Sequence, residues 1–344
     1  MRAVYVARTG GPEVLQVRQV PVPIPQAGEV CVRVCASGLQ LADVMARRGH
    51  YPLAPKPPCV LGYEVAGYVE RAGAGVLGFA VGQRVLAMPH FGGQADFVCI
   101  PADRVVPIPE NMSFEDAAAL PVSYLTARHL LFSAARVRPG DRVLVHMAGG
   151  GVGLAVLQLC RTVPGVEVLG TSSASKHELL RAQGCHHPID YRTRNYAAEV
   201  LRITGGQGVD VVLDSLGGRD SRIGFALLRP FGRLVMYGAA RMLDCGRPRS
   251  LQLLRTLIPA LMPAFAPFTL LQTNRSVTGV SLGRHWFEDD AHTGSALSTL
   301  VQMYTKEQIR PVIDSVFELA DVAAAHQRLE LRKNAGKVVL RHAD

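Results

Sequence analysis

A glycine-rich turn between an apolar strand and an apolar helix limits the possible folds of this chain more than any other feature. Residues 143–159 read VLVHMAGGGVGLAVLQL. Ala148, Gly150 and Gly153 keep the G-x-G-x-x-G spacing, with Ala in the first place. Gly150 lets the backbone approach a pyrophosphate, and Gly153 lets helix and strand pack closely. The free N–H groups of the helix N-terminus favour an anion. We therefore expect a dinucleotide phosphate site at Ala148, Gly150, Gly151, Val152 and Gly153; a glycine-rich turn without a ligand is the alternative.

Strand and helix patterns alternate after this turn. Expected strands are Val166–Gly170, His187–Asp190, Val209–Asp214 and Arg233–Gly238, and expected helices are Ser175–Gln183, Ala197–Thr204 and Ser221–Leu228. Such alternation predicts βαβ units and a doubly wound parallel sheet. Residues 1–118 instead hold short β-type runs separated by Gly and Pro, and a last strand ends the chain. The prediction is an α/β protein with a β-rich domain at 1–120 and 288–344 and a nucleotide-binding domain at 121–287.

The end of the second expected strand indicates which nucleotide binds. NAD-binding proteins place Asp or Glu about 20 residues after the glycines, where it bonds the ribose 2′-OH. Here residues 170–176 read GTSSASK and contain no acid. Ser172, Ser173, Ser175 and Lys176 are donors suited to a 2′-phosphate, which favours NADPH over NADH. The alternative for Ser175 is that it caps the next helix.

Composition excludes several other classes of protein. With 48% hydrophobic and 19% charged residues, the 344-residue chain is not disordered as a whole. The net charge is +9, but the basic residues are scattered and no recognition motif accompanies them, so we expect no nucleic-acid partner. The seven cysteines form no C-x-x-C pair, and we expect reduced thiols and a cytoplasmic location. We expect no signal peptide, because the first residues, MRAVYVARTGGPEVL, read as a strand followed by a Gly-Gly-Pro turn. We expect no transmembrane segment, because the longest apolar stretch, Thr256–Leu271, contains three prolines and is short for a bilayer span.

Several motifs together resemble one known family. They include CASGLQLADVMARRGHYP (35–52), LGYEVAGYVERAGAGV (61–76), DVVLDSLGG (210–218) and KNAGKVVL (333–340), besides the glycine-rich turn. The chain is similar to the zinc-free medium-chain dehydrogenases/reductases of the quinone oxidoreductase (zeta-crystallin) group. Within it, the vesicle amine transport protein-like branch and the polyketide enoyl reductases match best. The resemblance covers essentially the whole chain. It implies a GroES-like catalytic domain, a Rossmann domain that binds NADPH, and a homodimer.

The resemblance also implies that no metal is bound. Zinc-dependent relatives place Cys and His at two positions that hold Gln40 and Tyr63 here, and Glu64 follows. Gln and Tyr are poor ligands for Zn²⁺, and the four-cysteine lobe of a structural zinc is absent. Without a Lewis acid, reduction of a C=C bond conjugated to a carbonyl is a better prediction than reduction of a simple ketone. Candidate substrates are lipophilic quinones, enones and enoyl thioesters, or a polyketide or polyene intermediate in natural product biosynthesis that cyclises on hydride addition.

Further cofactor contacts follow from the same resemblance. It places Lys176 and Tyr191 at the 2′-phosphate and Thr126 near the nicotinamide carboxamide. The remaining cofactor groove would be formed by Ser215, Leu216, Gly217, Tyr237, Gly238, Ser281, Leu282 and Asn334. The alternative for this last group is structural, because turns at strand ends favour Gly, Ser and Asn.

Four residues are candidates for positioning or protonating the substrate. Tyr51 matches a tyrosine that some enoyl reductases use as proton donor, and an ordinary pKa of about 10 suits donation. Its alternative role is packing at the mouth of the cleft. Gln40 replaces an Asn that contacts cofactor ribose or substrate, while Asp43 is more easily explained as structural. His50 is a second candidate donor.

One apolar segment, residues 241–275, has no assignment from its motifs. It could form a lid over a bulky substrate, a dimer contact or a membrane-surface patch, and its prolines argue against one continuous amphipathic helix. This segment motivates a rival prediction of another class: a nucleotide-binding protein associated with membranes or lipids that has little turnover.

Overall fold

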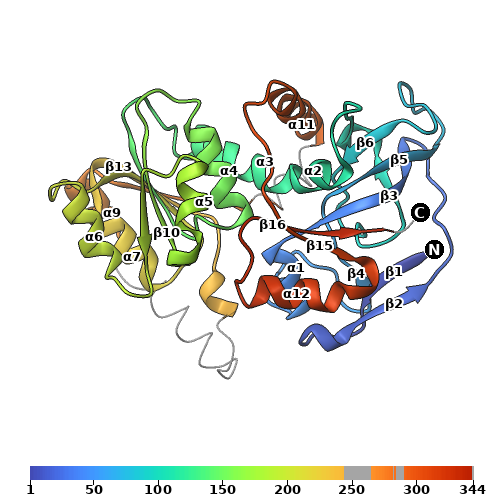
Figure 1. Ribbon diagram of the computed structural model, residues 1–344, viewed down its shortest axis with the longest axis horizontal. Coiled ribbons are helices and arrows are strands. Elements are labelled where there is room, and N and C mark those ends of the chain that lie inside the picture. The colour runs from blue at the N-terminus through green and yellow to red at the C-terminus, as the bar shows by residue number, and fades with distance from the viewer. Residues whose placement is uncertain (244–264, 282, 284–289, 343–344) are drawn as a thin grey trace. The chain divides into compact units, whose positions relative to one another are not determined.

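The structure is a computed structural model that describes residues 1–243, 265–281, 283 and 290–342 (Figure 1). Its contacts divide the chain into two compact units: Met1–Leu125 with Leu282–Asp344, and Thr126–Ser281. These limits differ by a few residues from those expected from the sequence.

The second unit is built on a sheet of six parallel strands in the order β11-β10-β9-β12-β13-β14. From β9 the chain adds strands β10 and β11 toward one edge of the sheet, and from β12 it adds β13 and β14 toward the other edge. The direction of strand addition therefore reverses between β9 and β12. Ligands of such sheets bind beyond the carboxyl ends of the strands at this reversal. The strands are β9 (Arg142–Val145), β10 (Glu167–Ser172), β11 (His187–Asp190), β12 (Val209–Asp214), β13 (Leu228–Met236) and β14 (Ser276–Gly279).

Helices cover both faces of this sheet (Figure 1). α4 and α5 lie on one face, and α6, α7 and α9 lie on the other. Because both faces are covered, the central strands are continuously apolar: Leu144, Val212 and Leu234 pack with Val200 of α6 and Phe225 of α7. The helices are α4 (Gly151–Cys160), α5 (His177–Ala182), α6 (Tyr196–Ile203), α7 (Arg219–Ala226) and α9 (Pro267–Thr273).

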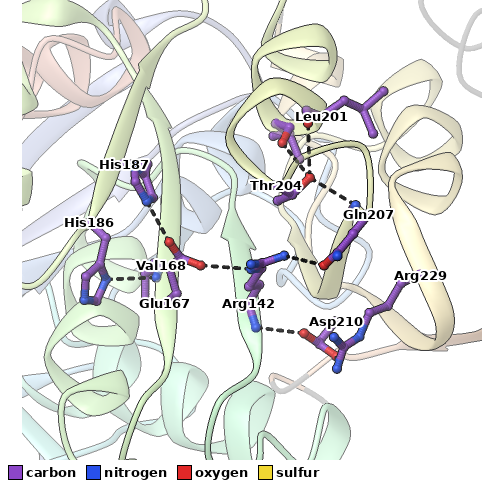
Figure 2. Close-up of polar contacts among 12 residues, drawn as sticks. Arg142, Glu167, Val168, His186, His187, Leu201, Thr204, Gln207, Asp210 and Arg229 are labelled. Carbon is purple, nitrogen blue, oxygen red and sulfur yellow. Dashed lines mark hydrogen bonds and ion pairs between the residues drawn. The ribbon is translucent and has the colours of Figure 1, made fainter.

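The amino ends of the strands are joined by a polar network (Figure 2). Arg142 at the start of β9 donates from Nε to Glu167 Oε2 at 2.9 Å, and its backbone N–H donates to Asp210 Oδ2 at 2.8 Å. The imidazole of His187 at the start of β11 lies 2.8 Å from Glu167 Oε1. These half-exposed ion pairs contribute little free energy each, but they align the strands at the end of the sheet opposite to the glycine-rich turn.

The first unit is organised around the long strand β3 (Glu29–Leu39), which pairs with β5, β7 and β16. The sheet order is β15-β16-β3-β5-β6-β8, and a second sheet has the order β2-β1-β4. The C-terminal strand β16 therefore lies beside a strand from the first forty residues. The other strands are β1 (Arg2–Val6), β2 (Leu15–Gln19), β4 (Cys59–Val60), β5 (Val65–Ala72), β6 (Arg84–Ala87), β7 (Phe97–Pro101), β8 (Val105–Pro107), β15 (Ile313–Glu318) and β16 (Lys337–Arg341).

The described α-helices of the first unit are α1 (Leu41–Arg47), α2 (Phe114–Ala119), α11 (Asp290–Thr305) and α12 (Val322–Glu330), and α3 (Pro121–Arg128) contains the boundary between the two units. The helical spacing of residues 117–131 is divided between two α-helices and a π-helical turn. α2 ends before Pro121, which starts α3, because proline has no N–H to continue a helix but fits its first turn. A π-helical turn, His129–Ala134, then follows.

The predicted fold class is confirmed: the chain is an α/β protein with a β-rich N-terminal domain of the GroES-like type and a parallel-sheet Rossmann-like domain. Within the part of the chain that the structure describes, no helix is long and apolar enough to cross a membrane. The unassigned segment 241–275 lies for the most part (244–264) outside the described residues, so its predicted roles stay open.

Candidate functional site

The glycine-rich turn joins β9 to α4 and leaves the helix N-terminus open. Gly150 is the N-cap of α4, and no side chain caps the helix among the described residues. The N–H groups of Gly151, Val152 and Gly153 therefore have no intrahelical acceptor. A Cβ at Gly153 would lie 2.5 Å from Ala148 O, whereas a Cβ at Gly150 would meet only Met147 O, at 3.4 Å. Gly153 is thus required by packing, and Gly150 keeps an open surface beside the free N–H groups.

Lys176 packs against this turn from the end of the second strand. Its Cδ lies 2.8 Å from the position that a Cβ of Gly149 would occupy. Ser172 is the last residue of β10, and Ser173 Oγ lies 3.2 Å from Ser175 Oγ. The alternative that Ser175 caps α5 is wrong, because the N-cap position is Lys176 and it has no side-chain cap bond. The backbone N–H of Tyr191 donates to Ser172 O at 3.3 Å, which brings Tyr191 to the same strand end.

Asp214 at the end of β12 organises the next loop, a role that the sequence analysis missed. This fully buried carboxylate accepts N–H bonds from Leu216 at 2.8 Å and Gly217 at 3.1 Å, and the Ser221 hydroxyl at 2.5 Å. A Cβ at Gly238 would lie 2.8 Å from Ser215 O. The structure therefore brings together five predicted residues: Ser215, Leu216, Gly217, Tyr237 and Gly238. The sequence signal that could have identified Asp214 is an acidic residue at the end of an otherwise apolar strand.

A buried histidine, also missed, lies between the turn and this loop. His146 is the last residue before the turn, and its Nδ1 lies 3.1 Å from Thr171 Oγ1. Its backbone carbonyl accepts from Ser215 Oγ at 3.5 Å, and its ring packs edge-on to Tyr196 at 5.0 Å. Burial lowers its pKa, so the imidazole is neutral. It links the ends of β9, β10 and β12 without adding charge.

Four other predicted cofactor residues are not brought to the turn by any described contact. Thr126 is buried in α3, and Ser281 is exposed after β14. Leu282 lies outside the described residues. Asn334 belongs to the first unit, where its side-chain amide donates to Gly336 O at 2.7 Å, which is the structural alternative given for it.

In the first unit, Gln40, at one of the two zinc-ligand positions, contacts a buried ion pair. Lys337 Nζ donates to Glu64 Oε1 at 2.5 Å and to Leu39 O at 2.9 Å. Gln40 Nε2 donates to the same carboxylate oxygen at 2.6 Å, and the N–H of Val122 donates to Oε2 at 2.8 Å. Both oxygens of Glu64 are thus occupied by donors.

Asp43 closes this cluster from the first turn of α1. Its carboxyl accepts from the backbone N–H of Gln40 at 2.8 Å and from that of Gly62 at 3.2 Å. Complete burial raises the pKa of Asp43 to about 7, while the nearby Lys337 opposes this shift. The contacts tie α1 to the loop before Tyr63, a structural task.

Tyr51 stands at the edge of an aromatic group in the same unit. Its ring lies 6.2 Å from that of Tyr63 at an interplanar angle of 77°, and Tyr63 lies 5.0 Å from Phe91. The phenol of Tyr51 is protonated at neutral pH, as any ordinary tyrosine is, and burial raises its pKa further. Tyr63 is buried, and its ring packs between those of Tyr51 and Phe91. His50, the second candidate donor, is half-buried in the turn after α1.

Comparisons with known protein families place both parts of the chain. Residues 26–110 match the family described as alcohol dehydrogenase GroES-like domain, and residues 183–340 match the one described as zinc-binding dehydrogenase. A synaptic vesicle membrane protein VAT-1 homolog from Danio rerio is 43% identical over 92% of this chain, which spans 65% of that protein. A quinone oxidoreductase from Rattus norvegicus is 33% identical over 98% of this chain and 96% of its own length.

Solved structures agree with these sequence matches. The human VAT-1 homolog-like protein has a TM-score of 0.85 at 38% identity, covering 99% of this chain and 98% of its own. The Escherichia coli quinone oxidoreductase complexed with NADPH has a TM-score of 0.85 at 28% identity, covering 99% and 100%. The CurK enoyl reductase has a TM-score of 0.83 at 28% identity, covering 99% of both chains.

Proposed function

This chain belongs to the medium-chain dehydrogenase/reductase family, and we propose that it is an NADPH-dependent reductase of C=C bonds conjugated to a carbonyl, working without a metal ion. Both the quinone oxidoreductase and the enoyl reductase among its relatives are oxidoreductases, which supports oxidoreductase activity for this chain. Quinones, enones and enoyl thioesters are the proposed substrates. A homodimer, a lipophilic substrate and a part in natural product biosynthesis stay predictions from the resemblance.

The occupied carboxylate of Glu64 is the observation that carries the metal-free proposal. Gln40 and Tyr63 are poor zinc ligands, and Glu64 already accepts hydrogen bonds from Gln40, Lys337 and Val122. A cation here would have to displace the buried ammonium of Lys337. The family described as zinc-binding matches residues 183–340, a range that does not include Gln40 or Tyr63.

The second unit fits NADPH. The open surface at Gly150 and the free N–H groups of α4 suit a pyrophosphate, because a helix N-terminus carries partial positive charge. Lys176, with Ser173 and Ser175 nearby, offers a cation and hydroxyl donors for the 2′-phosphate. The E. coli relative that shares this fold is complexed with NADPH, which supports the same cofactor here.

Bound NADPH would supply a hydride, and the chain's own residues would provide the proton. Hydride addition at the β carbon and protonation at the α carbon together reduce the double bond by two electrons. Tyr51 is the proposed proton donor, because a phenol with an ordinary pKa of about 10 is protonated at neutral pH and it matches a donor tyrosine in the family resemblance. Gln40, held by Glu64, is proposed to position substrate or cofactor, and Asp43 to hold α1 in place.

Two measurements on the purified protein test this proposal. The first is a fluorescence titration with NADPH and, separately, with NADH. The second follows NADPH consumption with a panel of quinones and enones such as benzoquinone and cyclohexenone. We expect NADPH-selective binding and turnover of at least one acceptor. NADPH binding without any turnover would favour the rival, a membrane- or lipid-associated nucleotide-binding protein, and absence of NADPH binding would refute the cofactor assignment.

A further inference from the structure

The hydroxyl group of Tyr51 lies directly against the backbone of Gly283. A Cβ built on Gly283 would lie 2.4 Å from Tyr51 Oη and 3.1 Å from Leu53 Cδ1. Ordinary van der Waals contact of a Cβ begins near 3.4 Å, so any side chain at residue 283 would have to displace the hydroxyl by about an ångström. The missing side chain of Gly283 therefore creates the space that the hydroxyl occupies.

The ring of Tyr51 cannot easily turn away from this position. It packs against a buried cluster that includes Val6, Ala46 and Leu61. Tyr63 contacts it edge-on at 6.2 Å and is itself held by Phe91. Edge-to-face aromatic pairs have a preferred geometry, so this packing fixes the plane of the Tyr51 ring. With the ring plane fixed, the position of the hydroxyl depends on the space left by Gly283.

We propose that Gly283 is a positioning residue that sets the location of the Tyr51 proton donor. This inference rests on the proposed reductase function and on Tyr51 as its donor. Both Tyr51 and Gly283 belong to the first unit, and the printed approach of the hydroxyl to Gly283 is made within that unit. A larger residue at 283 moves the donor but leaves every proposed phosphate contact in place.

Gly283→Ala is the direct test. A displacement of about 1 Å at a reacting group can lower a rate by on the order of 100-fold. We expect kcat for the enone that the wild type reduces fastest to fall about 10–100-fold, with the Kd for NADPH unchanged within twofold. Gly279→Ala is the matched control, because a Cβ there meets nothing within 4 Å. It is expected to keep kcat and Kd within twofold of wild type.

A double variant shows whether the effect of Gly283→Ala passes through the hydroxyl. Tyr51→Phe removes that oxygen, and it should lower kcat at least tenfold, as loss of a general acid does. Once the oxygen is absent, Gly283→Ala should not lower kcat further, and it should lower Tm by less than it does in the wild-type background, because only the 3.1 Å approach to Leu53 Cδ1 remains. Comparing the Tm change caused by Gly283→Ala in the two backgrounds tests the contact between residue 283 and the Tyr51 hydroxyl without requiring any enzyme turnover.

Several results would overturn the inference. They are an unchanged kcat in Gly283→Ala, an equal loss in Gly279→Ala, a full further loss in the Tyr51→Phe background, or an unchanged kcat in Tyr51→Phe. Absence of wild-type turnover with every acceptor would instead refute the proposed function, and the Tm comparison would then show separately whether Gly283 and the hydroxyl are in contact.

Discussion

Lys176 is the residue on which the preference for NADPH over NADH depends most. Its stem packs on the glycine-rich turn, and a charge-assisted bond to a phosphate contributes about 1.5–3 kcal/mol. We expect Lys176→Met to raise the Kd for NADPH about 10–100-fold and to leave the Kd for NADH within twofold, as measured by fluorescence titration. Lys306→Met removes an equal charge from an exposed position and should change neither value. An equal loss of both cofactors would show that Lys176 does not read the 2′-phosphate.

Asp43 makes stability depend on pH in a direction that can be tested. Burial raises its pKa from 3.8 to about 7, so the folded protein keeps a proton that the unfolded chain has lost. Folding then takes up a proton between about pH 4 and pH 7, and the contribution of Asp43 to stability falls as pH rises through this range. The buried histidines, whose pKa values are lowered, act in the opposite direction, so the wild-type curve alone does not isolate Asp43.

The comparison of wild type with Asp43→Asn does isolate it. We expect the stability advantage of wild type over the variant, measured by urea unfolding, to be about 1–3 kcal/mol larger at pH 5 than at pH 8. Asp103→Asn makes the same change at an exposed carboxyl and should leave the pH dependence as in wild type. An advantage that is equal at both pH values, or larger at pH 8, would contradict the raised pKa.

At the level of residues, spacing in the sequence identified motifs contained within a few residues, but not contacts between residues that are far apart in the sequence. The motif around Gly150 is contained in a few residues, and its strand–turn–helix context is present in the structure. The Lys337–Glu64 pair joins residues 273 positions apart, and no local pattern encodes such a contact. Tyr63 was recognised only as a poor zinc ligand, since its packing on Tyr51 depends on the folding of separate loops.

Among the elements, the turn before α4 contains two glycines with different roles: Gly153 allows close packing, and Gly150 leaves room for a ligand. A Cβ at Gly153 would clash with the backbone of Ala148 and Met147 at 2.5–2.6 Å, whereas one at Gly150 would contact only Met147 O at 3.4 Å. We expect Gly153→Ala to lower stability by about 1–3 kcal/mol and to weaken NADPH binding. Gly150→Ala should weaken NADPH binding at least tenfold with Tm nearly unchanged, because its methyl group faces the proposed phosphate site.

Thermal unfolding and NADPH titration of the two variants provide the check. Unchanged binding in Gly150→Ala would show that the pyrophosphate does not approach this turn. A Gly153→Ala protein as stable as wild type would show that α4 can move away from β9 at little cost, contrary to the close packing observed.

Element boundaries were predicted less well than element types. The apolar helix expected after the glycine-rich turn begins within the glycines themselves, at Gly151, so its first turn is formed by residues that weaken a helical pattern. The strand expected at Arg233–Gly238 starts at Leu228, since apolar periodicity does not show where pairing with β12 begins. α1 was not predicted: it is only seven residues long and depends on Asp43 for its N-terminal contacts.

For the molecule as a whole, the fold class followed from the order of the elements. Strand–helix alternation allows few arrangements other than a parallel sheet covered on both faces, and the observed strand order is one of them. The pairing of β16 with β3 was anticipated only as the return of a short tail to the first domain. Its register, which brings Lys337 to Glu64, follows from the packing of the complete chain.

Whether the protein depends on a metal ion can be measured on the complete chain, including the residues that the structure does not describe. The described residues contain no group of three His, Cys, Asp or Glu side chains that could hold a metal ion, but Cys245 and His285 lie outside them. Elemental analysis and chelation cover every residue. Because Lys337 already neutralises Glu64, we expect well under one zinc per chain, and EDTA dialysis should leave NADPH-dependent reduction within twofold of its starting rate. Close to one zinc per chain, together with a loss of rate that added Zn²⁺ restores, would contradict the metal-free proposal and require the Lys337–Glu64 pair to open.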